Sequence, residues 1–346
     1  MMVGVIGAGN WGKNLVRTFY CLGRLAGVVE VKPATRQWLA ATYPGLPLYS
    51  DYGDLLASDI AAVAIATPAA THYQVAREAL LAGKDVFVEK PLALSRAEAE
   101  ELVALAESKN RILMVGHLLL YQPAVQWLKR YLESGVIGPV AFLTQERLKL
   151  GRVRPVENVL WSFGVHDIAV LLYLVGQKPQ QVKASGRCFL QKEIEDDVYL
   201  HLKFPRGVAA HLHVSWLWPE QRRLLTIVGS KAMLVYDEVQ QRLTLHKKRV
   251  TPDLQSEDAG SEVVFQGGGE PLLLECRHFL DRVADRRPPL SDGRGALDVI
   301  AVLEEAEKQL KEDGAWTGRI ILSTNQPASM PGPGWAKGQG FGTSAT

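Results

Sequence analysis

A glycine-rich turn placed directly after a short apolar run is the feature that most constrains this chain. Residues 3–6 are apolar, the turn follows as Gly7-Ala8-Gly9-Asn10-Trp11-Gly12, and a helical pattern begins close behind it. In such a strand–turn–helix unit the first glycine permits the tight turn, and the second lets the backbone approach a pyrophosphate. The third allows close packing of helix on strand, and the helix N-terminus faces the phosphates. We therefore expect Gly7, Gly9, Asn10, Trp11 and Gly12 to bind a dinucleotide.

An acidic residue at the end of the second apolar run bears on which dinucleotide binds. Glu30 stands near the end of the run over residues 25–31, close to the spacing expected for a ribose-binding carboxylate. A carboxylate there accepts hydrogen bonds from the adenosine ribose and repels a 2′-phosphate, which favours NAD over NADP. Lys32 and Arg36 stand nearby and could tolerate a phosphate. The sequence therefore predicts NAD and leaves NADP possible.

Strand and helix patterns alternate over the first third of the chain. Helical patterns fall near residues 34–42, 52–57, 72–82 and 95–109, and short apolar runs near 47–49, 60–66, 85–89 and 112–115 separate them. This alternation predicts an α/β domain with a doubly wound parallel sheet over residues 1–120. Ligands of such sheets bind beyond the carboxyl ends of the strands, so Thr67 and Pro68 are candidates to line the cofactor. His72 begins the next helix, where it is either a further cofactor contact or a helix-capping or surface histidine.

The rhythm changes after about residue 120. Runs of alternating character dominate residues 182–246, and Pro205-Arg206-Gly207 joins two of them as a hairpin. We expect residues 121–323 to form an α+β domain with a large, mostly antiparallel open sheet that binds substrate and mediates oligomerisation. Residues 251–269 are polar and glycine-rich and predict a loop, helices are expected near 271–284 and 295–311, and residues 324–346 predict a disordered tail.

Bulk composition excludes several classes of partner. The formal net charge is +2, from 39 Lys+Arg against 37 Asp+Glu, which argues against nucleic acid and membrane surfaces as partners. No apolar run is long enough to span a membrane, and the N-terminus lacks the charged start and cleavage site of a signal peptide. The three cysteines are far apart and predict reduced thiols. A cytoplasmic location is the resulting expectation.

The ordered set of later motifs resembles the Gfo/Idh/MocA family of sugar and inositol dehydrogenases. Besides the glycine turn, the set comprises Ala66-Thr67-Pro68 followed by His72, and Glu89-Lys90-Pro91 at the end of a buried strand. The resemblance implies that Glu89 and Lys90 lie at the cofactor and that Lys90 is catalytic. The position of Lys90 supports this independently, because a lysine at the ligand end of the sheet could donate to a substrate hydroxyl oxygen and stabilise developing negative charge.

A second catalytic element is expected within residues 161–168. The family usually shows Asp-x-x-x-His here; His166 matches the histidine, whereas Ser162 stands where the aspartate is common. This departure puts a relay from position 162 in doubt, and Asp167 is more consistent with a helix-start or backbone partner than with a replacement. His166 is the candidate general base, since its ordinary pKa lies near neutrality. Oxidation of an alcohol with a nicotinamide needs no metal, and we expect His211 and His213 to lie on a sheet surface or interface.

Three segments look like one branch of that family. Residues 116–123, 148–152 and 158–161 resemble the nucleotide-sugar 3-dehydrogenases that act on UDP-N-acetylglucosamine or its uronic acid. The basic segment around Lys149 could hold a diphosphate or carboxylate, although a solvated loop explains it equally well. The candidate substrate-binding residues are Tyr121, Arg147, Arg152, Arg154, Trp161, Ser162 and Asp167. Core packing is an equal alternative for Tyr121.

Other functions remain open from the sequence alone. A free sugar or inositol dehydrogenase, a non-catalytic NAD-binding regulator, and a lyase or hydrolase that cycles NAD within one turnover are the alternatives. The presence of both Lys90 and His166 argues against the regulator, because a sensor needs neither residue. Large apolar residues within 208–216 predict that the sheet face is covered, so we expect a homodimer or homotetramer through the second-domain sheet.

Overall fold

A parallel sheet of six strands forms the first domain of the computed structural model, which describes residues 1–312. The strand order is β3-β2-β1-β4-β5-β6, and every pair is parallel. The strands are β1 (Val3–Ile6), β2 (Leu25–Val29), β3 (Leu48–Tyr49), β4 (Ala62–Ile65), β5 (Asp85–Glu89) and β6 (Leu113–Gly116). The helices are α1 (Gly12–Cys21), α2 (Pro33–Thr42), α3 (Tyr52–Leu56), α4 (His72–Leu81) and α5 (Arg96–Ser108), with the 3-10 turn η1 (Ala69–Thr71). The predicted doubly wound sheet is confirmed.

The middle strands of this sheet are apolar on both faces because helices cover both. All four residues of β1 and of β4 are buried. Ser95 caps α5 by accepting a hydrogen bond from the backbone N–H of Glu98, and Asp51 caps α3 in the same way through Gly53. The burial of continuous apolar strands fixes the sheet, and the caps fix where two of its helices begin.

A mixed sheet of eight strands forms the second domain. Its order is β14-β13-β12-β11-β7-β10-β9-β8, and only β7 and β10 run parallel. The strands are β7 (Val140–Leu148), β8 (Gln181–Arg187), β9 (Asp197–Lys203), β10 (Ala209–Ser215), β11 (Arg222–Gly229), β12 (Met233–Asp237), β13 (Arg242–Val250) and β14 (Ser256–Gln266). The expected hairpin is present, with the short turn η4 (Pro205–Gly207) joining β9 and β10.

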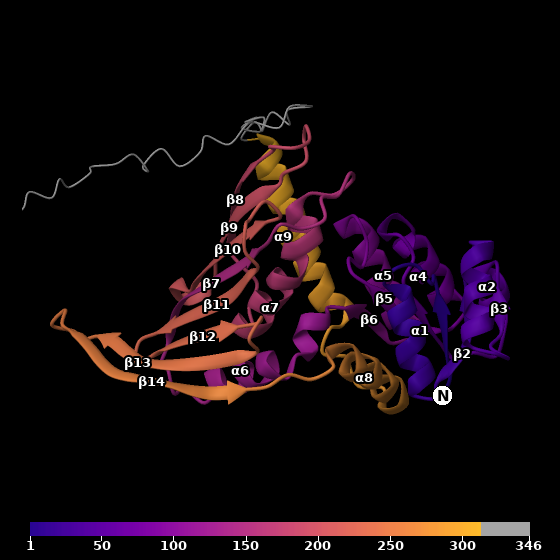
Figure 1. The fold of residues 1–346 in the computed structure, drawn as a ribbon, viewed down its shortest axis with the longest axis horizontal. Helices are drawn as coiled ribbons and strands as arrows, with labels where there is room; N and C mark the ends of the chain where they lie inside the picture. The colour runs from indigo at the N-terminus through magenta and orange to yellow at the C-terminus, as the bar shows by residue number, and fades with distance from the viewer. Residues whose placement is uncertain (313–346) are drawn as a thin grey trace, which may run out of the picture.

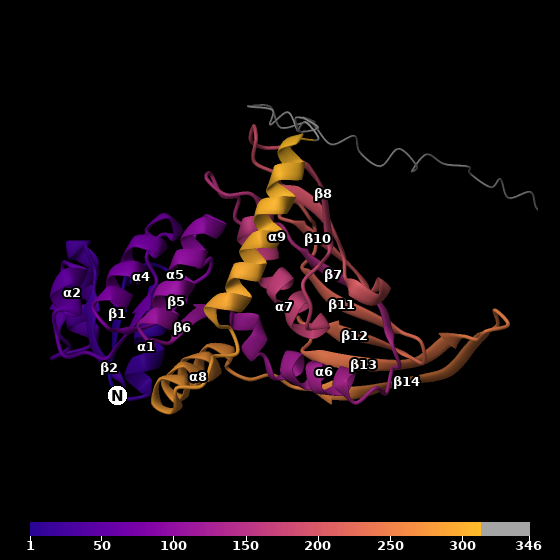
Figure 2. The ribbon, with the colours of Figure 1, turned by 180° about the vertical axis from the view of Figure 1, so that it is seen from behind.

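Helices cover one face of this second sheet. They are α6 (Pro123–Glu133), α7 (Val165–Val175) and α9 (Gly293–Glu312), preceded by the short turns η2 (Leu118–Tyr121) and η3 (Leu160–Gly164). Figures 1 and 2 show α7 and α9 between the sheet and the first domain, whereas no described helix lies on the opposite face. The covered face carries the core of the domain, including Trp216, Leu200 and Leu212.

The two domains are interleaved along the chain. Helix α8 (Pro271–Asp285) follows the second sheet in sequence but lies beside α1 of the first domain (Figure 1). Its Phe279 ring packs against Phe87 of β5, with ring centroids 5.7 Å apart. The hydroxyl of Ser291, just after α8, donates to the carbonyl of Val115 at 2.6 Å. Residues 271–291 therefore link the two domains at the edge where β5 and β6 stop.

One secondary-structure prediction was wrong. Residues 251–269 were expected to be a loop, yet Ser256–Gln266 forms β14 and pairs antiparallel with β13. This edge strand is exposed on both faces over most of its length, so polar residues occupy both faces. The sequence of β14 therefore lacks the alternation of apolar and polar residues that marks a strand packed on one face. The predicted disordered tail at 324–346 lies outside the described residues. Within residues 1–312 no helix is long and apolar enough to cross a membrane.

Candidate functional site

The glycine turn provides a cradle that fits a dinucleotide. Gly7 has a φ of +93°, and a Cβ on it would lie 2.9 Å from the carbonyl oxygen of Ala66. A Cβ on Gly12 would lie 2.1 Å from the carbonyl oxygen of Gly7, so α1 begins against the turn itself. At Gly9, by contrast, nothing lies within 4 Å of a built Cβ. Gly7 and Gly12 thus serve internal packing, and Gly9 leaves open space at a helix N-terminus, where a pyrophosphate would be held.

Glu30 is fixed at the end of β2 next to this turn. Its carboxylate accepts two hydrogen bonds from backbone N–H groups, one from Ala8 at 3.0 Å and one from Lys32 at 2.9 Å. Arg36, which could have bound a 2′-phosphate, instead donates to the backbone carbonyl of Glu30 at 2.6 Å. A buried, oriented carboxylate at this point suits an unphosphorylated ribose and opposes a phosphate.

Glu30→Ala is expected to weaken NAD binding about tenfold, roughly 1.4 kcal/mol, and to narrow the preference for NAD over NADP. The substitution removes the ribose acceptor and leaves the N–H of Ala8 without its partner. Titration of the purified variant with each dinucleotide measures both dissociation constants. Glu30→Gln is the control, because its side-chain oxygen still accepts from Ala8 but the negative charge is lost. In this variant the affinity for NADP should rise while the affinity for NAD stays close to that of the wild type. An unchanged NAD/NADP ratio in both variants would mean that Glu30 does not contact the ribose.

Thr67 and Pro68 follow β4 at the same edge, as predicted. Thr67 is partly buried and Pro68 is exposed, so both are available to a ligand. His72 is not available. Its side chain is 1% exposed, and its ring nitrogens lie 2.7 Å from the carbonyl of Pro91 and 2.9 Å from that of Thr67. The His72 ring is therefore not open to the expected cofactor contact. It instead links the turn at Thr67 to the segment after Lys90 through these two hydrogen bonds.

A hydrogen bond joins the glycine turn to the end of β5, the strand that precedes Lys90. The indole N–H of Trp11 donates to the carboxylate of Glu89, the last residue of β5. Burial raises the pKa of Glu89 to about 7, against the opposing effects of Trp11 and Lys90. Behind it, the side chain of Glu275 on α8 is fully buried, and neither of its oxygens has a partner among the described residues. Sequence reasoning missed Glu275, although a lone acid on the apolar face of a helix was the available signal.

Glu275→Gln is expected to raise the free energy of unfolding by about 1–3 kcal/mol at about pH 8 and to change it little near pH 4. Burial, followed by the charge of Glu89, raises the pKa of Glu275 well above its ordinary value. Because the folded-state pKa is raised, the wild type loses stability as pH rises from the unfolded pKa towards the folded one, and glutamine removes this loss. Denaturant unfolding at both pH values measures the change, with exposed Glu270→Gln as the control. A gain that is equal at both pH values, or absent, would contradict this account.

Lys90 brings the two domains together. It follows β5, its peptide bond to Pro91 is cis, and its ammonium donates to the backbone carbonyl of Ser162 at 3.1 Å. Burial lowers the pKa of Lys90, and the nearby carboxylates of Glu157 and Glu89 oppose this shift. Ser162, which stands where the family commonly has an aspartate, thus contributes its main chain to the site.

The segment that carries Ser162 is held by a side chain that the sequence analysis missed. The side-chain oxygen of Asn158 accepts from the backbone N–H groups of Leu160 and Trp161, each at 3.1 Å. Its amide donates to Glu195 at 2.7 Å. Asn158 therefore fixes the start of η3 and, through it, the carbonyl that meets Lys90.

His166 lies in the first turn of α7, one turn after Ser162. The ring is partly buried, and its Nδ1 atom is buried without a hydrogen-bond partner among the described residues. Burial lowers the pKa of His166 well below its ordinary value, and the positive charge of Lys90 lowers it further. The imidazole is therefore neutral near pH 7, which is the form that accepts a proton. His166 and Lys90 are therefore near neighbours across the two domains, and their catalytic roles stay predictions.

Arg147 and Asp167 belong to a closed ion-pair network beside His166. Two nitrogens of the Arg147 guanidinium donate to the two oxygens of the Asp167 carboxylate, at 2.7 and 2.9 Å. The guanidinium also donates to the carboxylate of Glu238 at 2.7 Å. Arg223 completes the network through Glu238 at 2.8 Å. Because these groups satisfy one another within the sheet and α7, the structure gives Arg147 and Asp167 internal partners in place of the predicted substrate contact. Asp167 is a side-chain partner of Arg147, which was not expected either.

Tyr121 and Trp161 are also internal. The Tyr121 side chain is 1% exposed, and its hydroxyl lies 2.8 Å from that of Ser291. Trp161 is 8% exposed, and its indole N–H donates to Glu307 of α9 at 3.0 Å. For Tyr121 the packing alternative is correct, and the structure does not support substrate contact by either ring. Both residues instead fix η2 and η3 against the C-terminal helices.

Of the three arginines predicted to bind substrate, Arg152 and Arg154 are not held in the internal ion-pair network. They lie in the loop between β7 and η3; Arg152 is exposed, and Arg154 lies 3.6 Å from Glu157 at the loop surface. The charges of Arg154 and Glu157 both act on Lys90, so this loop lies near the lysine. The two arginines therefore stay predictions for substrate binding.

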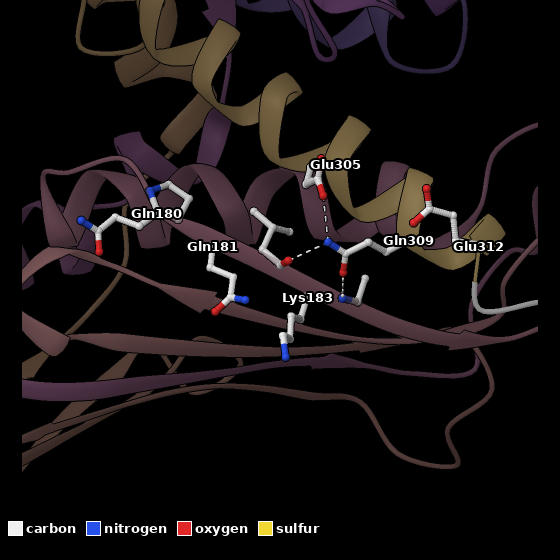
Figure 3. A pocket seen from close by; sticks show the side chains of 9 residues that line it. Gln180, Gln181, Lys183, Glu305, Gln309 and Glu312 are labelled. Carbon is white, nitrogen blue, oxygen red and sulfur yellow. Dashed lines mark hydrogen bonds between the residues drawn. The ribbon is translucent and has the colours of Figure 1, made fainter.

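A separate cavity of about 780 Å³ lies away from this site, between α9 and the edge strand β8. Figure 3 shows Gln309 reaching from α9 to the strand, where it accepts from the N–H of Ala184 and donates to the carbonyl of Val182. These bonds satisfy backbone groups that an edge strand otherwise leaves open. Among the described residues, no group of three or more His, Cys, Asp or Glu is placed to hold a metal ion.

These features define an oxidoreductase with an NAD-binding Rossmann domain and a second, mixed-sheet domain that completes the active site. The chain belongs to the Gfo/Idh/MocA oxidoreductase family. Residues 1–117 match the family's NAD-binding Rossmann fold, and residues 125–235 match its C-terminal domain. A crystal structure from Magnetospirillum magnetotacticum MS-1, described as an oxidoreductase, shares 33% identity and covers 88% of this chain and 99% of its own, with a TM-score of 0.76.

Named relatives include dehydrogenases of different substrates. UDP-N-acetylglucosamine 3-dehydrogenase from Acidithiobacillus ferrooxidans is 27% identical over 307 residues, or 87% of this chain and 94% of that protein. Its solved structure covers 90% of this chain and 99% of its own, with a TM-score of 0.78. A 4-carboxy-2-hydroxymuconate-6-semialdehyde dehydrogenase from Sphingobium is 25% identical over 91% of this chain and 100% of that protein. The chain is thus an NAD-binding oxidoreductase whose substrate the family alone does not fix.

Proposed function

We propose that this enzyme oxidises a ring hydroxyl, at carbon 3, of a UDP-linked N-acetylated amino sugar. The observation that carries the chemistry is the convergence of Lys90 from the first domain with Ser162 and His166 from the second. NAD, when bound, supplies the acceptor for the hydride. Lys90 donates to the substrate oxygen and stabilises its developing charge, and neutral His166 takes the hydroxyl proton.

Two further observations support a nucleotide sugar. The similarity to UDP-N-acetylglucosamine 3-dehydrogenase extends over both domains. The loop near Lys90 carries Arg152 and Arg154, and guanidinium groups suit the oxygens of a diphosphate or carboxylate.

The proposal is tested by following NADH formation with four compounds: UDP-N-acetylglucosamine, its uronic acid, free N-acetylglucosamine and myo-inositol. Only the UDP-linked sugars should reduce NAD efficiently, and Arg152→Gln combined with Arg154→Gln should raise KM for them at least tenfold with less effect on kcat. The exposed substitution Lys192→Gln, on a separate turn, is the matched control. Efficient turnover of a free sugar or inositol would replace this proposal with the simpler dehydrogenase.

We also propose a homo-oligomer that pairs through the bare face of the eight-stranded sheet. The strands of this sheet carry three exposed large apolar residues, Phe142, Tyr199 and Val263. Exposure of apolar side chains to water is unfavourable in free energy, which favours covering this face by a second copy of the chain. Light scattering on the purified protein measures the mass. A monomer at micromolar concentration would contradict the proposal.

A further inference from the structure

His117 is a buried histidine placed beside Lys90 that the reaction described above does not use. Gly116 pairs with Glu89 in the parallel register of β6 and β5. His117 and Lys90 therefore each come directly after the end of one of two adjacent strands, and adjacent strands lie about 4.8 Å apart in such sheets. The His117 side chain is 3% exposed, and neither ring nitrogen has a partner among the described residues.

Unsatisfied nitrogens gather at this point between the domains. Besides both nitrogens of His117, the Nδ1 atom of His166 is buried without a partner among the described residues. A positive charge on His117 would lower the pKa of His166, so the two rings are near neighbours. Buried polar atoms without partners cost free energy, so such a cluster calls for a functional explanation. Ser162 offers no carboxylate at the position where the family commonly pairs one with the base.

A cavity continues from His117 towards the surface. It has a volume of about 260 Å³ and is lined by His117 together with residues of η2, α7 and α9, among them Ala169 and Asp298. None of the predicted cofactor residues lines it. Asp298 stands there in an ion pair with the exposed Lys178, at 2.5 Å. At about 30 Å³ for each molecule, the cavity has room for several waters.

We propose that His117 relays the proton of the oxidised alcohol from His166 to water in this cavity. The inference rests on the proposed dehydrogenase chemistry. The C–H hydrogen leaves as hydride with two electrons to NAD, and the hydroxyl proton passes to His166. His166 passes a proton to one nitrogen of His117, and the other nitrogen of His117 releases its own proton to cavity water. One proton thus leaves for each alcohol oxidised, and both histidines return to neutral.

The surroundings of His117 suit a carrier that does not retain the proton. Burial, and then the charge of Lys90, lowers the pKa of His117 to about 4, so a proton that arrives there moves on. Both nitrogens are closed to water in this structure. The ring must therefore turn to reach the cavity, and no hydrogen bond among the described residues opposes that turn.

Rapid mixing with a pH indicator separates proton release from NADH formation. In the wild type, both signals should rise together in the first turnover. In His117→Phe and His117→Gln, the proton should appear at least about tenfold more slowly than NADH, and kcat should fall by a similar factor. The matched control is His278→Gln, because that ring already accepts from Leu290 and packs on Tyr121 nearby. Simultaneous signals in both His117 variants, or an equal lag in the control, would overturn the relay.

Two further measurements exclude a merely structural role. Imidazole added to His117→Ala should restore most of the lost proton-release rate, whereas failure of rescue with a folded variant counts against a relay. In the ligand-free protein, deuterium should enter carbon 2 of the His117 ring, and Ala169→Leu, which fills the cavity, should slow this exchange several-fold. No exchange in the wild type would mean that water does not reach the ring. Because this measurement needs no turnover, it stays decisive even if no sugar is oxidised and the proposed function fails.

Discussion

Lys90→Met is expected to lower kcat at least about 100-fold while the dissociation constant of NAD changes no more than about twofold. Methionine retains the packing of the lysine stem but removes the donor that faces Ser162 and the substrate oxygen. Steady-state kinetics with the best substrate and direct titration with NAD measure the two quantities.

The same strand supplies the matched control for this substitution. Lys84 stands just before the opposite end of β5, is 8% exposed, and donates to the backbone carbonyl of Ser58 at 2.6 Å. Lys84→Met removes a buried lysine with one hydrogen bond, but far from the ligand edge, so kcat should stay within about twofold of wild type. If Lys90→Met turns over at the wild-type rate, the site assignment is wrong.

Arg147→Met is expected to lower the free energy of unfolding by about 3–5 kcal/mol. The side chains of Asp167 and Glu238 are 1% and 8% exposed, so the variant leaves two carboxylates buried without their main cation. Arg223 remains for Glu238 but does not replace the bidentate partner of Asp167. Chemical denaturation at constant pH measures the loss.

An exposed ion pair between β11 and β7 provides the control for the buried network of Arg147. Arg222 and Glu146 are 49% and 25% exposed, and Arg222→Met should cost no more than about 1 kcal/mol. The loss in Arg147→Met should also shrink at lower pH, because protonation removes the unpaired charges. A loss below about 1 kcal/mol would mean that the network contributes no more than a surface ion pair.

Local sequence patterns were sufficient for the first domain. The turn at residues 7–12 has its own steric requirements, since Gly7 and Gly12 leave no room for a Cβ. Apolar runs such as β4 predict buried parallel strands without reference to distant residues. Lys90 and His166 were found because each stands at a fixed place in a local motif. By contrast, polar β14 was missed because its exposed strand lacks the alternation that burial imposes.

The roles of the charged and aromatic residues depended on distant partners. The motif around residues 147–167 suggested substrate contacts, but Arg147 lies 91 residues from Glu238, which satisfies it. The partner of Tyr121 is 170 residues away, and that of Trp161 is 146 residues away. No spacing within a motif distinguishes a free guanidinium from one that a remote strand neutralises.

The sequence by itself therefore determined the Rossmann turn, the strand-end Glu30 and Lys90, and His166, because local sterics and strand ends place them. Only the tertiary structure decided which side chains remain open at the site. It closed Arg147, Asp167, Tyr121 and Trp161 into internal contacts, and it brought His117 and Glu275 beside the strand-end residues. The physical reason is that burial and charge pairing are set by segments far apart in the chain, and packing alone brings those segments together.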